Sequence, residues 1–325
     1  MKTLLVISLL ATCLAKDWKS FKVNFNKMYT GLSEELKRMA AYEANKMWVE
    51  NHNKRYENGQ VSFKVAMNEF GDLDDEEFGK KYLSTTGTVM NKLKNVHHSF
   101  NEQITSVVPE SMNWTMKGAV TPVKEQKSCG ACWAFSATGA IEGQIFKKTG
   151  KLIPLSAQHL LDCSSKFGNR GCKGGMPFKA FRYILQHGVQ TDESYPYLGE
   201  EGKCQYTDNK QVVKIKAFAF IKKIGDKENT LKTAVAHVGP ISACVWASRA
   251  YRFFSGGIYQ DEECINNTNV NHAVLVVGYG REKEMDYWLI KNSWGMSWGE
   301  YGYGKMIRNM DDHCNIASRN VFPIV

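Results

Sequence analysis

Gln126-Lys127-Ser128-Cys129-Gly130-Ala131-Cys132-Trp133-Ala134-Phe135 is the stretch that decides the fold, because a cysteine stands here at the start of an apolar run. The run ends at Gly150, and the pattern predicts a helix over 132–148. A thiol attacks only as its thiolate, which the free N–H groups and dipole of a helix N-terminus stabilise. Cys132 is therefore the candidate nucleophile. Its backbone N–H and the side-chain amide of Gln126 are candidate donors to an oxyanion.

Two later segments supply the groups that a cysteine nucleophile needs. His272 opens a predicted strand and is the candidate base that forms and holds the thiolate. Asn292 can orient the imidazole, because its amide oxygen accepts a ring N–H without adding a charge. Trp294 follows closely and would shield that hydrogen bond from water. Together these residues predict nucleophilic catalysis.

Composition and length are those of a globular protein. The chain has 325 residues, of which 43% are apolar and 23% charged. This length suggests two domains, or one large domain with an appendage. The 42 basic and 33 acidic side chains are scattered without a Lys/Arg run, so the net charge of +9 does not predict nucleic-acid binding.

The N-terminus predicts the route through the cell. Lys2, an apolar stretch over 3–14 and small residues near its end indicate a secretory signal peptide over 1–15, the alternative being a buried N-terminal helix. No run reaches the roughly 20 apolar residues of a membrane span, so we expect no membrane-spanning segment. The rest of the chain would enter an oxidising compartment, where disulfides form. Asn113 and Asn266 lie in sequons and are candidate glycosylation sites.

Cysteine counting leaves the pairing open. Removal of Cys13 with the signal peptide leaves eight cysteines, enough for four bridges, but counting cannot assign partners. No second Cys-x-x-Cys and no His pair has zinc spacing, so we expect no metal.

The order of the predicted elements indicates an α+β chain. Residues 16–107 are charged and helix-prone, with Ser33 as the expected cap of a helix whose first turn is acidic. Residues 85–105 are expected to form an exposed connector open to proteolysis. Further helices are predicted over 157–163, capped by Ser156, and over 177–187, ended by Gly188. Predicted strands follow over 212–215, 218–224, 272–279, 287–291 and 301–306. A helical half followed by a sheet half favours a site in the cleft between them.

The Cys129-Gly130-Ala131-Cys132-Trp133 motif, with His272 and Asn292 far downstream, closely resembles the papain-like cysteine proteases, and cathepsin L in particular. The resemblance covers essentially the whole chain. It implies a two-lobed fold, with a helical left lobe and a β-barrel-like right lobe, preceded by a helical inhibitory propeptide. It therefore implies a signal peptide over 1–15, a propeptide over 16–107 and a mature peptidase domain over 108–325.

The first part carries motifs that resemble cathepsin L-like propeptides. The long helical motif corresponds here to Glu34, Arg38, Tyr42, Asn45, Val49 and Asn53. A second motif corresponds to Ala66, Asn68, Phe70 and Asp72, with Ala66 where the family usually has Gly. The resemblance implies that the propeptide covers the cleft, runs through it backwards, and opens it on removal near Val108.

The same resemblance assigns bridges and substrate contacts. It implies bridges Cys129–Cys172, Cys163–Cys204 and Cys264–Cys314, which leave Cys132 and Cys244 free. Gly174 and Gly175 would pair with the substrate backbone, because glycine allows close approach. The remaining predicted substrate contacts are Met176, Pro177, Cys244, Val270, Ala273, Trp294 and Arg319.

Several positions depart from the family pattern. Arg319 replaces a small residue at the pocket floor, where it either pairs with an acidic substrate side chain or folds outward into water. Lys127 and Asn315 stand where the family usually has Gly, and Asn271 where many relatives have Asp. None of these changes removes a catalytic group.

The sequence therefore predicts a cysteine endopeptidase made as a zymogen, without cofactor or metal. The expected partners are protein and peptide substrates, its own propeptide as inhibitor, and cystatin-like inhibitors, with the enzyme a monomer in the lysosome or outside the cell. Two alternatives are a catalytically inactive binder with the same fold and a thiol–disulfide oxidoreductase using Cys129 and Cys132. The complete set of catalytic residues argues against the inactive binder. Because the acidic segment 72–77 would lose its ion pairs in acid, we expect self-processing at acidic pH.

Overall fold

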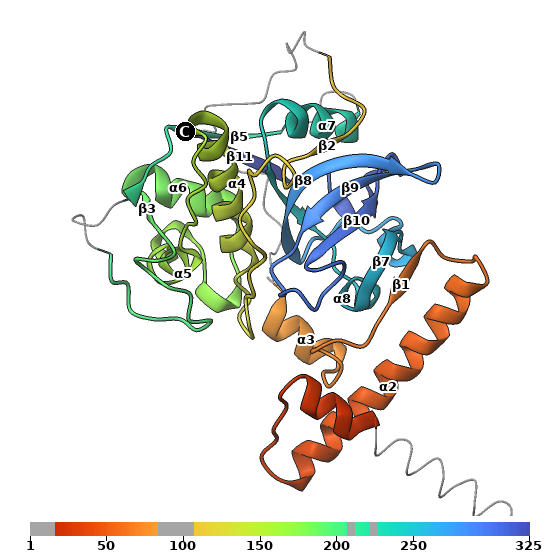
Figure 1. Cartoon of the computed structure of the whole chain (residues 1–325). Helices are drawn as coiled ribbons and strands as arrows, with labels where there is room; N and C mark the ends of the chain where they lie inside the picture. Colours follow the sequence, from red (N-terminus) through yellow and green to blue (C-terminus); the bar gives the residue numbers. More distant parts are fainter. Residues whose placement is uncertain (1–16, 84–106, 207–211, 222–225) are drawn as a thin grey trace, which may run out of the picture.

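Figure 1 shows the computed structural model, in which residues 17–83, 107–206, 212–221 and 226–325 are described. The predicted signal peptide and the predicted connector over 85–105 lie outside these ranges. The described chain comprises an N-terminal helical part, a helical lobe and a sheet lobe.

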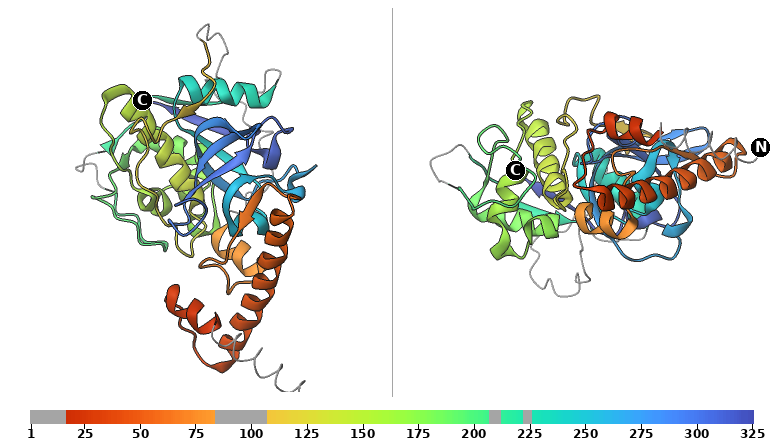
Figure 2. Two further views of the ribbon diagram at one scale, coloured as in Figure 1. Left: turned by 45° about the vertical axis from the view of Figure 1, so that its right-hand side comes forward. Right: turned by 90° about the horizontal axis from the view of Figure 1, so that it is seen from below.

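The N-terminal part protrudes from the two lobes (Figure 1). It contains a helical stretch over 17–24, α2 (Leu32–Glu57), β1 (Phe63–Val65) and α3 (Asp75–Tyr82). An apolar cluster confined to this part is built on Trp18, Phe21 and Tyr42. Figure 2 shows α2 and α3 lying against the sheet lobe.

The prediction that Ser33 caps the long helix is wrong. α2 begins at Leu32 with Gly31 in the N-cap position, two residues earlier than a Ser33 cap implies, and Ser33 lies inside its first turn. The reason is Glu34, whose Oε2 accepts hydrogen bonds from the backbone N–H (3.1 Å) and the hydroxyl (2.8 Å) of Thr30. A glutamate in the first turn that reaches back in this way fixes the start of a helix without help from a serine cap.

The helical lobe follows the sequence prediction closely. Its elements are α4 (Cys132–Thr149), α5 (Ala157–Cys163), η1 (Ser165–Phe167), η2 (Gly171–Lys173) and α6 (Pro177–His187), with the small sheet of β3 (Val189–Gln190) and β4 (Val212–Val213). The hydroxyl of Ser156 accepts from the backbone N–H of His159, which confirms the predicted cap of α5. Gly188 ends α6 as predicted, with φ of 80°.

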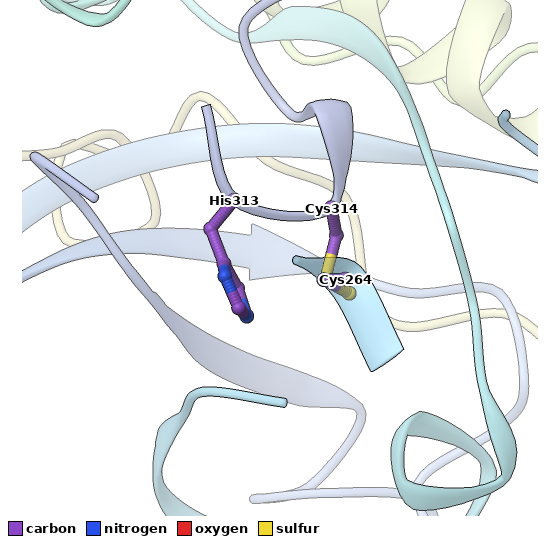
Figure 3. A group of neighbouring side chains, drawn as sticks. All are labelled: Cys264, His313 and Cys314. Atoms are coloured by element: carbon purple, nitrogen blue, oxygen red, sulfur yellow. A yellow bond between two sulfur atoms is a disulfide. The ribbon is translucent and has the colours of Figure 1, made fainter. Parts of the chain in front are cut away.

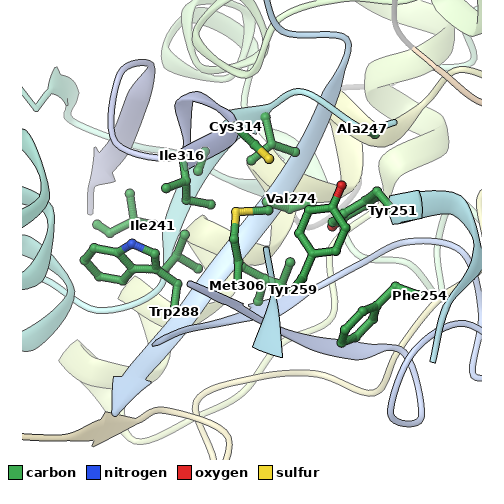
Figure 4. Packing of buried hydrophobic residues seen from close by; sticks show 14 of the residues in the cluster. Ile241, Ala247, Tyr251, Phe254, Tyr259, Val274, Trp288, Met306, Cys314 and Ile316 are labelled. Atoms are coloured by element: carbon green, nitrogen blue, oxygen red, sulfur yellow. The ribbon is translucent and has the colours of Figure 1, made fainter. Parts of the chain in front are cut away.

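The sheet lobe is built on one sheet with strand order β1-β7-β10-β9-β8-β6-β11-β5, and β2 pairs separately with β8. These strands are β2 (Met112–Asn113), β5 (Ala217–Phe220), β6 (Ile241–Val245), β7 (Phe254–Tyr259), β8 (His272–Glu282), β9 (Met285–Lys291), β10 (Tyr303–Ile307) and β11 (Asn320–Ile324). The remaining elements are α7 (Lys227–His237), α8 (Arg249–Phe253), η3 (Glu262–Cys264) and η4 (His313–Asn315). Figure 4 shows the packed core of this lobe, with Trp288, Met306 and Tyr259 among its buried side chains.

The helix α4 forms the junction between the two lobes. It packs on α5 and α6 on one side and on β6, β8 and β11 on the other. Two of its glycines are required by this contact, because a Cβ on Gly139 would lie 2.8 Å from Leu275 and one on Gly143 would lie 2.6 Å from Pro240. These contacts hold the middle of α4 against β8, and nearer the start of α4 the hydroxyl of Ser136 donates to the carbonyl of Val274 at 2.7 Å.

Candidate active site

Cys132 is the first residue of α4, where no side chain caps the helix. It is fully buried and belongs to a small apolar cluster with Cys244, Val270 and Ala273, against which Met176 packs. The preceding loop is fixed by the Cys129–Cys172 disulfide and by a 2.9 Å hydrogen bond from the N–H of Gly130 to the carbonyl of Cys172. This close approach leaves no room for a side chain, since a Cβ on Gly130 would lie 2.5 Å from that oxygen. The loop therefore holds Cys132 at a helix N-terminus that favours a thiolate.

His272 is the first residue of β8 and is oriented by Asn292, which follows β9. The Nε2 atom of His272 and Oδ1 of Asn292 are 2.8 Å apart, and the same oxygen accepts the N–H of Ser293 at 2.8 Å. Trp294 covers the imidazole, with 4.4 Å between ring centroids. The other ring nitrogen, Nδ1, is buried and has no hydrogen-bond partner within the described ranges. The asparagine thus assigns the proton to Nε2 and leaves Nδ1 available for chemistry.

Burial dominates the electrostatics of this imidazole. It lowers the pKa of His272 to about 4, and the hydrogen bond to Asn292 offsets only part of this shift. In the covered site His272 is therefore a neutral base at neutral pH.

Gln126 reaches the same place from the segment before α4. Its Nε2 donates to the carbonyl of Cys129 at 2.7 Å and to the carbonyl of Tyr82 at 2.9 Å. Its Oε1 accepts a hydrogen bond from the hydroxyl of Ser293 at 2.8 Å. Ser293 is not among the predicted site residues, although it lies between Asn292 and Trp294. Ser293 therefore orients the amide of Gln126, and a carbonyl from the end of α3 already occupies that amide.

The N-terminal part covers the site with aromatic side chains. Phe70 and Phe78 both pack edge-on against Trp294, at centroid distances of 5.6 and 5.3 Å. Tyr82 in turn stacks on Phe78 at 5.3 Å. The backward course of the chain through the cleft falls on residues beyond Leu83 that lie outside the described ranges.

The motif residues of α2 fasten this cover. Arg38 donates to both carboxylate oxygens of Glu77, at 2.6 and 2.7 Å. Asn45 donates to the carbonyls of Gly71 and Leu73, at 2.9 and 2.8 Å. Further along α2, Asn53 exchanges two hydrogen bonds with the backbone of Val65. The spaced polar residues of α2 therefore hold the segment that leads to the site.

The second motif links the cover to itself and to the sheet lobe. Asn68 donates to the carbonyl of Arg252 at 2.8 Å and accepts from the N–H of Phe70 at 3.1 Å. Asp72 is buried and accepts from Lys27 and from the hydroxyl of Tyr29, at 3.0 and 2.9 Å.

The predicted pocket residues fall on both sides of Cys132. Met176 precedes α6 and Pro177 is its first residue, whereas Cys244 lies on β6 beside Ala273 on β8. Arg319 is half-buried, its carbonyl accepts the N–H of Cys244 at 3.3 Å, and its positive charge acts on that thiol. Burial still raises the pKa of Cys244 to about 12, so this thiol stays protonated.

The two glycines assigned to substrate have structural requirements of their own. Gly174 has φ of 106°, which favours glycine. A Cβ on Gly175 would lie 2.7 Å from the ring of Trp133 and 2.5 Å from Asn169 Oδ1. Packing against Trp133 therefore explains Gly175 without reference to a substrate.

The three predicted disulfides are present, and neither Cys132 nor Cys244 forms a disulfide. Because Cys129 is bonded to Cys172, the oxidoreductase alternative, which needs a Cys129–Cys132 pair, is wrong.

Figure 3 shows His313 beside the Cys264–Cys314 bridge. These three residues are close enough to suggest a metal site, but both sulfurs are consumed by the disulfide and His313 Nε2 accepts the N–H of Asp261 at 2.9 Å.

The two sequons differ in accessibility. Asn266 is exposed in a left-handed turn with φ of 60°. Asn113 lies on β2 and is half-buried, and its Oδ1 accepts the backbone N–H (2.9 Å) and the hydroxyl (2.6 Å) of Thr115.

Comparisons with known proteins agree with this geometry. The papain family of cysteine proteases matches residues 108–324, and the cathepsin propeptide inhibitor domain matches residues 18–78. A cathepsin L-like peptidase of Aedes aegypti is 43% identical over 95% of this chain and 93% of its own length. Human cathepsin L2 is 42% identical over 95% of this chain and 92% of its own length.

A solved structure covers both parts at once. Digestive procathepsin L 3 from the larval midgut of Tenebrio molitor superposes with a TM-score of 0.87 at 36% identity, covering 96% of this chain and 99% of that one.

Among the described residues, no helix is long and apolar enough to span a membrane.

Proposed function

Because the chain belongs to the papain family of cysteine proteases, we propose that Cys132 is its nucleophile, assisted by His272, Asn292 and Gln126. The chain is a cathepsin L-like cysteine endopeptidase in zymogen form, with its inhibitory propeptide in place. The 2.8 Å contact between His272 and Asn292 carries this assignment of roles, together with the position of Cys132 at the start of α4 in one cluster with Ala273.

The reaction is acyl transfer to sulfur and then to water. The Cys132 thiolate attacks the peptide carbonyl, and the resulting oxyanion accepts hydrogen bonds from the Cys132 N–H and the Gln126 amide. His272 protonates the leaving amine, and the carbon–nitrogen bond breaks to leave a thioester. His272 then takes a proton from water, which attacks the thioester and restores the thiol. Asn292 holds the ring in the orientation that serves both steps.

The propeptide inhibits by occupying this machinery. The carbonyl of Tyr82 takes the Gln126 amide that a substrate carbonyl needs, and Phe70 and Phe78 cover Trp294. Removal of residues 16–107, with cleavage near Val108, would free the amide. It would also return water to His272, whose pKa then rises toward its ordinary value and favours a thiolate–imidazolium pair.

The pocket beside Cys132 favours an apolar substrate side chain two residues before the scissile bond. Met176, Cys244, Val270 and Ala273 form its described apolar surface. Arg319 adds a cation at its edge, and no described carboxylate pairs with it, so we expect an acidic side chain to be accepted as well. A substrate library tests this: replacement of Arg319 by Ala should lower the Glu-to-Leu preference at this position, and an unchanged preference removes the idea.

Partners and location follow from the same assignment. We expect protein and peptide substrates, cystatin-like inhibitors that fill the cleft, and a monomeric enzyme in the lysosome or outside the cell. Glycosylation is expected at Asn266, which is exposed, ahead of Asn113, whose side chain is held in a turn.

Alkylation tests the assignment of the nucleophile. After removal of the propeptide, a thiol alkylator should label Cys132 and abolish peptide hydrolysis. Replacement of Cys132 by Ala should abolish both, whereas replacement of Cys244 by Ala should preserve labelling. Hydrolysis that survives the Cys132→Ala change would overturn the proposal.

A further inference from the structure

Helix α8 of the peptidase domain carries two arginines that the propeptide covers. Arg252 is fully buried, and its Nη2 lies 3.0 Å from Asn45 Oδ1 and 3.2 Å from Asp75 Oδ1. Arg249 donates to the same oxygen of Asn45 at 2.6 Å, and its Nε lies 3.8 Å from Asp75. Within the described ranges, both arginines form ion pairs with Asp75 alone. The propeptide therefore supplies the only described carboxylate within ion-pair distance of either arginine, while Glu263 of the peptidase domain acts on Arg249 from farther away.

Aromatic rings complete the surroundings of these cations. The guanidinium of Arg252 lies 4.3 Å from the ring centroid of Phe253 and 4.9 Å from that of Phe78. Arg249 lies over Trp48 of α2 at 5.4 Å. Removal of the propeptide takes away Asp75, Phe78 and Trp48 but leaves Phe253 beneath Arg252. A planar cation on an aromatic face binds carboxylates well, because the ring replaces part of its hydration.

The surface has further unused hydrogen-bonding capacity. The Nε atoms of Arg249 and Arg252 are buried without a hydrogen-bond partner among the described residues, even with the propeptide bound. The carbonyl of Phe253 accepts the N–H of Ala66 at 2.8 Å, and β1 pairs antiparallel with β7. Loss of the propeptide exposes this carbonyl and the β7 edge, both of which can bind an extended peptide.

The surface is continuous with the leaving-group side of the active site. Tyr251 of α8 packs edge-on against Trp294 at 5.6 Å, and Trp294 covers His272, which protonates the leaving amine. The helix α3 joins Asp75 to Tyr82, whose carbonyl lies on Gln126. At about 1.5 Å per residue this helix spans about 10 Å, a distance that an extended chain covers in just over three residues, that is, by about the fourth residue.

We propose that, once the propeptide has left, Arg249 and Arg252 form a second substrate-binding site for an acidic segment of protein substrates, on the leaving-group side of the scissile bond. The acidic residues would lie about four or more positions beyond that bond. This inference rests on the proposed protease function and extends it from the cleft to α8.

Matched peptides test the proposal on the activated enzyme. They share the residues around the scissile bond and carry either Asp-Asp or Asn-Asn at the fifth and sixth positions beyond it. A third substrate carries a fluorogenic leaving group in place of all residues beyond the bond. Two ion pairs at a partly exposed surface predict about a fivefold higher kcat/KM for the Asp-Asp peptide at low salt, falling toward unity at high salt.

Variants locate the effect. Arg252→Gln and Arg249→Gln should each lower the acidic preference while leaving the fluorogenic substrate unaffected. The half-buried Arg249 serves if the Arg252 variant fails to fold. Arg281→Gln, which removes an exposed arginine that pairs with Glu284 away from α8, is the matched control and should keep the preference. Equal cleavage of the two peptides by the wild type, or an undiminished preference in Arg249→Gln, overturns the second site. Failure to cleave the fluorogenic substrate counts instead against the protease assignment.

Discussion

Lys127 and Asn315 both have left-handed backbones, with φ of 53° and 64°, which explains why glycine is usual at these positions. The two residues nevertheless differ in what their side chains do. The side chain of Lys127 donates an exposed 3.1 Å hydrogen bond to the carbonyl of Leu198. Asn315 donates to the carbonyls of Asn267 and Asn269, at 2.7 and 2.9 Å, and asparagine tolerates this conformation.

Replacement by glycine should therefore have opposite effects at these two positions. Lys127→Gly relieves backbone strain and should raise the free energy of unfolding by about 0.5–1 kcal/mol. Asn315→Gly loses two half-buried hydrogen bonds and should lower it by about 1–2 kcal/mol. Urea unfolding of the full chain, in a Cys132→Ser background that prevents self-processing, measures both changes. Shifts of the same sign would contradict this explanation.

Asn271 needs both halves of its amide. Its Oδ1 accepts the N–H of Ala247 at 2.7 Å and its Nδ2 donates to the carbonyl of Ala247 at 3.0 Å. Asn271→Asp should cost about 1–3 kcal/mol of stability, because a carboxylate cannot donate to that carbonyl. The new charge next to His272 favours the imidazolium, so the alkaline limb of kcat/KM against pH should move to higher pH in the activated enzyme. An unmoved limb would show that this position does not influence the imidazole.

Among the elements, α3 is fastened to α2 by the pair of Arg38 and Glu77, whose side chains are 10% and 17% exposed. The hydrogen bonds from Arg38 lower the pKa of Glu77 to about 2. A carboxyl with a depressed pKa stabilises the fold fully above its ordinary value of 4.5, and the stabilisation is lost as pH falls from there toward about 2. This pair therefore still holds at pH 5.

Glu77→Gln should reveal the pH range over which the Arg38–Glu77 pair contributes to stability. The variant should be less stable than the parent by about 1–3 kcal/mol at pH 6, and the difference should shrink as pH falls from 4.5 toward 2.5. Urea unfolding of the Cys132→Ser chain at several pH values gives the curve. A difference that already closes between pH 7 and 5 would mean that the pair is the acid trigger after all.

Protonation of His52 on α2 changes stability at a higher pH than protonation of Glu77 does. Burial lowers its pKa below 6.5, its Nε2 lies 3.1 Å from the carbonyl of Phe63, and its ring packs on Phe63 and Trp48. Its charged neighbours are Arg55, which disfavours protonation, and Asp261, which favours it. The neutral ring stabilises the contact of α2 with β1 above pH 6.5, and this stability is lost as pH falls below 6.5.

His52→Gln keeps a donor to Phe63 but removes the titration. We expect the variant to process itself more slowly than the parent at pH 5 and at a similar rate at pH 4, where other groups titrate. Electrophoresis of the full chain after timed incubation measures this. Equal rates at pH 5 would exclude His52 as a trigger.

Prediction succeeded where the signal is local in sequence. The helix at Cys132, the Ser156 cap and the ends of α6 each depend on a few adjacent residues, and the structure confirms them. The pairing of β1 with β7 joins segments almost two hundred residues apart, and neither segment carries a local sequence pattern that predicts its partner. The contact of Arg252 with Asn45 likewise depends on how two separate units dock. The disulfide pairing came from the resemblance, because cysteine positions alone leave it open.

At the scale of the whole molecule, the propeptide and the peptidase domain share one sheet, since β1 extends it at β7. Release therefore breaks strand pairing, the aromatic contacts at Trp294 and the arginine contacts of α8 together. An activating pH need only weaken one of these contacts to shift the balance, because folded proteins and their docked segments are marginally stable. The pH response is the sum of groups that act in both directions.

Glu69 acts against release in acid. It lies on the propeptide where Ser297 donates to it at 3.0 Å, and burial and the nearby charge of Glu125 raise its pKa. An acid whose pKa is raised by docking destabilises the docked state at neutral pH, and this cost disappears as pH falls through the raised value. Glu69→Gln keeps the acceptor for Ser297 without the charge. In the Cys132→Ser chain, the propeptide of this variant should therefore resist added protease longer than the parent at pH 7 and equally at pH 4. If the variant gains more resistance over the parent at pH 4 than at pH 7, the sign assigned to Glu69 is wrong. No described group would then be known to oppose the effect of His52 on release in acid.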